Sequence, residues 1–270
     1  MSRLAFAVLA LATTLSGPLK AHELWIEPLD WMVEADGSLS ANLVNGQSFN
    51  GLRLAYFPNR IMTFDVRLGD EVVPVTARLG STPALEMPAL GDGLHVAEYV
   101  STVSTVTYQS WDKFLSFAEH KDLGDVTAIR DAQGLPEEGF AEAYTRFSKS
   151  LIGVGSAAGT DTVLGLETEL VALANPYTDD MSAGLPVQLY YQGEVRANEQ
   201  VELFDRAPDG SVEITRLRTD DQGIVALPVM PGHSYMADAV VLRLPSPELA
   251  DETGAVWESL WANLTFTVPD

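Results

Sequence analysis

The stretch Leu260-Trp261-Ala262-Asn263-Leu264-Thr265-Phe266-Thr267-Val268 has an apolar core residue at every second position. Successive side chains of a β-strand point to opposite faces, so Leu260, Ala262, Leu264, Phe266 and Val268 would share one face of a strand. Other strand-like runs precede this one from Leu166 onward, with turn signals such as Pro208-Asp209-Gly210 between them. Seven such strands in the last 105 residues predict a small Ig-like β-sandwich.

The first half of the chain is also rich in strand patterns, from Leu24 to about Thr107, and Gly69-Asp70 reads as a tight hairpin turn. The Gly-rich segment 153–165 is the best linker. We therefore expect a mainly β protein with two β-sandwich-like domains, an N-terminal one over 22–165 and an Ig-like one over 166–270.

A change of period near Tyr108 predicts a helical insertion over about 108–152. Its first helix, from Trp111 to about Leu123, repeats apolar residues at helical spacing, and a second short helix is expected over 125–132. A third is expected after Pro136, where a proline and two acids precede an apolar stripe. The stripe consists of Phe140, Ala143, Tyr144, Phe147 and Leu151.

The N-terminus has the pattern of a secretory signal peptide over residues 1–21. A basic start precedes a mainly apolar run of 12 residues, Leu4 to Leu15, and a small residue, Ala21, stands at the expected cleavage point. Cleavage there makes His22 the first residue of the mature protein and leaves 14 basic residues against 38 acidic ones, a formal net charge of −24. This charge argues against nucleic acid as a partner and against anionic lipid surfaces.

The rest of the composition points to a periplasmic protein. The chain contains no cysteine, which excludes disulfides and thiolate metal sites. No later stretch approaches the 18 apolar residues of a membrane span, so we expect no membrane insertion after the signal peptide is removed. The usual role of an acidic surface is solubility.

His22 carries the sharpest chemical lead, because a free α-amine and an imidazole on one residue can chelate a transition metal. The alternative is a disordered terminus without a ligand role. His120 and His233 are the candidates for a further ligand; their simpler interpretations are an interaction with a helix C-terminus and an exposed loop histidine. His95, in a strand pattern, is a weaker candidate. No pair has the spacing of a zinc enzyme, so a metal site must be assembled in three dimensions.

The sequence shows no nucleophile elbow, phosphate loop or dinucleotide fingerprint, and no spacing singles out a catalytic triad. We therefore predict no catalytic residues and no enzymatic activity. Trp25, Trp31, Trp111, Trp257 and Trp261 could stack on sugars, but core packing is the favoured interpretation.

The mature start, Ala21-His22-Glu23-Leu24-Trp25-Ile26-Glu27-Pro28, resembles that of a periplasmic family of unknown function grouped with components of cobalt and nickel uptake systems. Segments 111–123, 218–223 and 257–266 resemble the same family. The resemblance implies two β-rich domains and a metal-handling role, with His22 as a ligand. Family members often have a histidine in the strand corresponding to 235–244, where this chain has none, so His233 or His120 would have to substitute.

These observations together predict a periplasmic protein that binds nickel, cobalt or copper and serves an inner-membrane metal transporter. One alternative is a copper-dependent oxidative enzyme built on the same terminal chelate. The other is a structural or binding sandwich protein without a metal.

Overall fold

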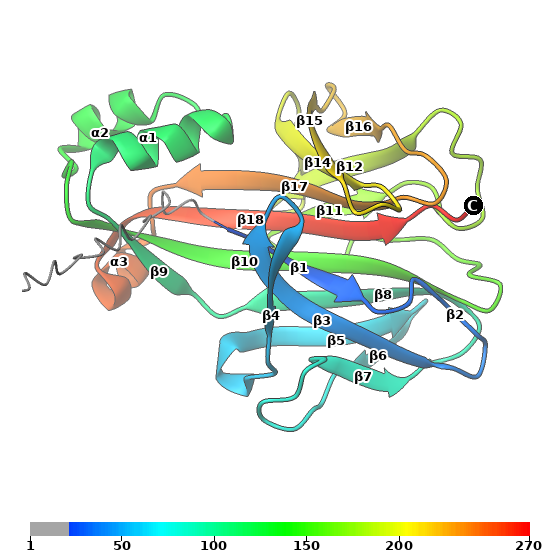
Figure 1. The fold of residues 1–270 in the computed structure, drawn as a ribbon. Helices are drawn as coiled ribbons and strands as arrows, with labels where there is room; N and C mark the ends of the chain where they lie inside the picture. The colour runs from blue at the N-terminus through cyan, green and yellow to red at the C-terminus, as the bar shows by residue number, and fades with distance from the viewer. Residues whose placement is uncertain (1–21) are drawn as a thin grey trace, which may run out of the picture.

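The computed structural model describes residues 22–270, so the predicted signal peptide, 1–21, lies outside the described residues. A long ten-stranded sheet forms the middle of the molecule (Figure 1). Its spatial order is β15 (Val212–Arg218), β14 (Gln200–Arg206), β17 (Ser234–Arg243), β18 (Ala255–Thr267), β10 (Phe140–Val154), β8 (Gly93–Ser101), β5 (Ile61–Leu68) and β6 (Glu71–Pro74), with β2 (Met32–Val33) and β9 (Ser104–Tyr108) also paired to β10.

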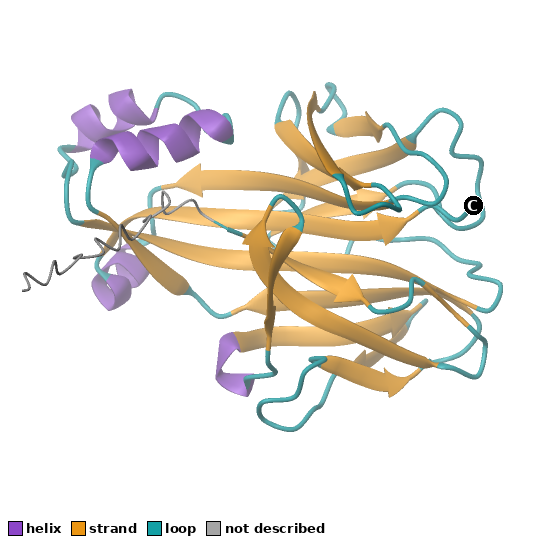
Figure 2. Cartoon of the chain, in the orientation of Figure 1, coloured by secondary structure: helices purple, strands orange, loops and turns teal. Residues whose placement is uncertain are grey.

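Two four-stranded sheets and a few short helices complete the fold, and the α-helices lie at one end of it (Figure 2). The first sheet contains β1 (Glu23–Pro28), β3 (Ser38–Gln47), β4 (Asn50–Leu54) and β7 (Leu85–Pro88). The second contains β11 (Thr168–Ala172), β12 (Leu185–Tyr191), β13 (Glu194–Val195) and β16 (Ile224–Leu227). The helices are the 3-10 turn η1 (Pro58–Arg60) and the α-helices α1 (Trp111–His120), α2 (Val126–Gln133) and α3 (Pro247–Thr253).

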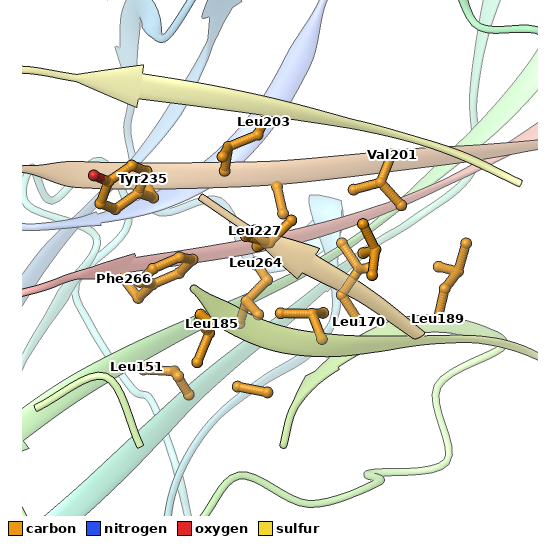
Figure 3. Close-up of a cluster of buried hydrophobic side chains, with 14 of the residues drawn as sticks. Leu151, Leu170, Leu185, Leu189, Val201, Leu203, Leu227, Tyr235, Leu264 and Phe266 are labelled. Atoms are coloured by element: carbon orange, nitrogen blue, oxygen red, sulfur yellow. The ribbon is translucent and has the colours of Figure 1, made fainter. Parts of the chain in front are cut away.

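The mainly β, sandwich-like fold class is confirmed. The core of the C-terminal half lies between the large sheet and the β11–β12–β16 layer, and Figure 3 shows its side chains interdigitating. The alternating residues Leu264 and Phe266 of β18 meet Leu185 and Leu227 of the opposite layer there. Burial of these side chains, each contributing about 1.5–3 kcal/mol, stabilises the sandwich.

The two predicted domains share one sheet. β10, from the first half, pairs in parallel with β18, from the second, from Ala141↔Ala255 to Ser150↔Thr265. The predicted boundary at 165/166 therefore does not separate sheets. The division of the chain into two domains stays a prediction.

Two of the three predicted helices are confirmed as α1 and α2. Asp125 caps α2 by accepting a hydrogen bond from the Ala128 backbone N–H at 2.9 Å, and Gly134 ends it in the left-handed conformation. The apolar side of α1 covers one end of the large sheet, where Phe117 stacks on Trp261 with ring centroids 5.6 Å apart.

The third predicted helix is wrong, because residues 140–154 form the central strand β10. The strand has neighbours on both sides and is covered on both faces, so nearly all its side chains are buried. Polar residues such as Glu142 and Arg146 occupy one of these faces. A strand buried on both faces loses the apolar–polar alternation that identifies strands in a sequence, and the remaining apolar residues imitate a helical stripe.

Candidate functional site

A buried cluster of charges lies where the start of β1, the end of α1 and strands β14 and β17 meet. The ammonium group of Lys121, directly after α1, donates hydrogen bonds to Glu23 at 3.1 Å, Glu202 at 2.5 Å and Asp238 at 2.8 Å. All four side chains are almost fully buried. Glu202 and Asp238 face each other because they are register partners in β14 and β17. We call these four residues the Lys121 cluster.

One ammonium serves three carboxylates, and Arg216 adds a second positive charge by donating a hydrogen bond from Nε to Oε1 of Glu202 at 3.2 Å. Burial lowers the pKa of Lys121, but the charges of Asp238, Glu23 and Glu202 outweigh this and raise it overall. Burial likewise tends to raise the pKa of Glu202, yet Lys121 and other donors hold it below its usual value. Asp238 is less well compensated, and burial raises its pKa to about 6.

The three carboxylates have the spacing of a cation site, with one oxygen of each within 4.8 Å of the others. Lys121 already supplies the cation at their centre, so we do not regard this triad as an open metal site. One oxygen of Glu23 and one of Asp238 are nevertheless buried without a hydrogen-bond partner among the described residues. Both amide atoms of Asn263, the cross-strand neighbour of Asp238 in β18, are in the same state.

The residue at the predicted mature terminus is fixed to the protein body. His22 is exposed, but its carbonyl accepts a hydrogen bond from Nη2 of the buried Arg146 at 2.6 Å. The guanidinium of Arg146 lies over the Trp261 ring at 3.9 Å, and Lys121 lies 4.8 Å from the same ring. Glu23, the next residue, is held by Lys121.

His120 lies beside the same cluster, at the end of α1 and half exposed. Its Nε2 is 3.0 Å from Oε1 of Glu202, and Nη2 of Arg216 is 2.6 Å from its Nδ1. A guanidinium only donates hydrogen bonds and an ionised carboxylate only accepts them. The neighbours therefore assign the proton to Nε2 and leave Nδ1 as the acceptor.

The other two histidines lie away from this cluster. His233 precedes β17 by one residue, and its Nδ1 is 2.6 Å from Asp205. It is five residues from Asp238 along extended chain, or about 16 Å at the usual rise per residue. His95 is fully buried and accepts a hydrogen bond from the Leu90 backbone N–H at 3.0 Å, as a structural residue would.

The structure thus brings His22 and His120 to one cluster and leaves His233 out. The strand in which the family resemblance placed a second ligand, β17, contributes Asp238 to that cluster. Sequence reasoning missed Lys121, Arg146 and Asp238. Asp238 stands alone in an apolar run, which is a weak signal of burial, whereas Lys121 lies among Glu119, His120 and Asp122 and gives none.

The tryptophans support packing rather than sugar stacking. Trp25, Trp257 and Trp261 are almost fully buried. They contact other aromatic rings of the core, as when Trp257 lies 5.0 Å from Phe114 between ring centroids.

A family model described as a domain of unknown function, DUF4198, matches residues 19–243. The chain belongs to this family. The match includes the N-terminal segment around His22, the Lys121 cluster and all of β17. No curated protein matches the chain. Within residues 22–270, no helix is both long enough and apolar enough to cross a bilayer.

Proposed function

We propose that this DUF4198 protein is a periplasmic transition-metal-binding protein, with His22 as its primary ligand residue and His120 as the second imidazole. The ion would be nickel, cobalt or copper, because imidazole and amine nitrogens suit these metals. The protein would scavenge the ion or pass it to an inner-membrane uptake system. The grouping of similar periplasmic proteins with cobalt and nickel uptake supports this role.

The anchoring of residue 22 carries the proposal. A metal chelate at a free terminus must overcome the entropy of ordering that terminus. Here the carbonyl of His22 is already held by Arg146, and the neighbouring Glu23 by Lys121, while the His22 side chain stays exposed. His22 and His120 are the chain neighbours of Glu23 and Lys121, and these two residues form one ion pair.

Each ligand would need to be deprotonated before it binds metal. The α-amine has an unperturbed pKa near 8, so metal competes with a proton for it at neutral pH. His233 has no place in this proposal, because its ring contacts Asp205 near the start of β17, far from Asp238.

Metal titration of correctly processed protein tests the proposal. Protein beginning at His22 should bind Ni(II), Co(II) or Cu(II) with sub-micromolar affinity, and His22→Ala should abolish this binding. His233→Ala is the matched control and should leave the affinity unchanged. Absence of binding to all three ions would refute the metal function and leave the structural alternative. Reductant-dependent peroxide formation by the copper-loaded protein would instead favour the oxidative enzyme.

A further inference from the structure

The neighbours of His120 suggest how the proposed metal site is controlled. We propose that Arg216 is a displaceable cap on Nδ1 of His120, and that an incoming divalent metal ion takes the place of its guanidinium. Glu202 would remain on Nε2 and orient the ring. This inference rests on the proposed function, because it concerns the second imidazole of the same site.

The hydrogen-bond arrangement supports each part of this inference. Histidine ligands commonly donate their other ring N–H to a carboxylate, which fixes the tautomer and makes the ligand nitrogen more basic. Glu202 already provides that carboxylate, 3.0 Å from Nε2. It is itself buried and held by Lys121, so the ring has a fixed partner on the protein side. The remaining nitrogen, Nδ1, is the one that faces Arg216.

Arg216 has the properties of a cap that can leave. Its side chain is 49% exposed, whereas that of Glu202 is 1% exposed. It projects from β15, an edge strand of the large sheet, and its Nε also donates a hydrogen bond to Oε1 of Glu202 at 3.2 Å. Once this bond and the contact with His120 are given up, the guanidinium can turn into solvent without moving the backbone. A positive group at Nδ1 repels a divalent cation, and it also occupies the lone pair that the metal needs.

Arg218 offers a matched comparison. It lies two residues further along β15, on the same face, is 47% exposed and pairs with Asp122 rather than with His120. Substitution of either arginine by methionine removes one positive charge from the same surface. Only the Arg216 substitution removes the group in contact with His120, together with its hydrogen bond to Glu202, so the His120→Asn background described below separates the two contacts.

The test is a metal titration of protein beginning at His22, using whichever of Ni(II), Co(II) and Cu(II) the wild type binds most tightly. Arg216→Met should bind this ion about tenfold more tightly, since a hydrogen bond of this kind and the charge repulsion are both lost. Arg218→Met should change the affinity much less. In a His120→Asn background, the gain from Arg216→Met should disappear, which is the coupling that a double-mutant cycle measures.

Equal effects of the two arginine substitutions, or a gain that survives in the His120→Asn background, would overturn the inference. If the wild type binds metal but neither Arg216→Met nor His120→Asn changes the affinity, the cap is refuted while the His22 chelate stands. If neither the wild type nor Arg216→Met binds any of the three ions, both proposals fail. Nitrogen-15 NMR of the metal-free protein supplies an independent check: His120 should carry its proton on Nε2, and the opposite tautomer would contradict the cap.

Discussion

Replacement of Lys121 by methionine tests whether the Lys121 cluster is shielded from water and whether its charges depend on one another for stability. The substitution keeps most of the side-chain volume but removes the only ammonium that contacts Glu23, Glu202 and Asp238, leaving three buried carboxylates together. Removal of one partner from a buried ion pair costs about 3–5 kcal/mol, and the like-charge repulsion places this case near the upper end. For a chain of this length, the melting temperature should fall by roughly 10 °C or more.

Urea unfolding followed by circular dichroism measures this loss, with Lys113→Met as the control on the exposed side of the same helix. Lys113→Met should change the free energy of unfolding by less than about 0.5 kcal/mol. Addition of Asp238→Asn to Lys121→Met should recover part of the stability, because one uncompensated carboxylate is then neutral. A loss below about 1 kcal/mol for Lys121→Met, without recovery in the double variant, would refute the description of the cluster as a buried, mutually dependent set of charges.

Three further outcomes follow from the same structure. Burial raises the pKa of Asp238 to about 6 in the folded protein, so its ionisation destabilises the fold as the pH rises from about 4 through 6. The free energy of unfolding of Asp238→Asn, which resembles the protonated form, should therefore gain about 1 kcal/mol on that of the wild type between pH 5 and pH 7.5. A difference that does not depend on pH would contradict this. Trp261→Ala should cost about 3–5 kcal/mol and lower the melting temperature by several degrees in calorimetry, since the ring is buried under Phe117 and Arg146; unchanged stability would restore the sugar-stacking interpretation. Intact-mass analysis of the exported protein should show His22 as the first residue, and a start two or more residues away would remove the amine–imidazole chelate.

The sequence was most informative where one face of a strand is buried and the other is not. The alternation of Leu264 and Phe266 identified β18, and Gly69-Asp70 correctly marked the two-residue hairpin between β5 and β6. It failed at β10, where Glu142 and Arg146 point to a second, polar interior. Period-based reasoning assumes that polar residues face solvent, and this strand breaks that assumption from Glu142 to Ser150.

The site was predictable only as far as single residues carry their own chemistry. His22 could be identified because its ability to chelate a metal depends on its position directly after the predicted cleavage point. The partners of His120 could not, since Glu202 and Arg216 reach it from strands more than 80 residues away. A parallel pairing such as that of β10 with β18 joins segments distant in the chain, so no tight turn between them marks the pairing in the sequence. The Lys121 cluster depends on that pairing through the position of Arg146 and Trp261.

The most direct test of the central claim compares two forms of the protein that differ by one residue. One begins at His22, and the other carries a single additional alanine before it, so that the α-amine is displaced while every contact of Glu23, Arg146 and Lys121 can persist. We expect sub-micromolar binding of Ni(II), Co(II) or Cu(II) in titration calorimetry by the first form and a collapse of that binding in the second. Equal affinity in both forms, or binding by neither, would contradict it.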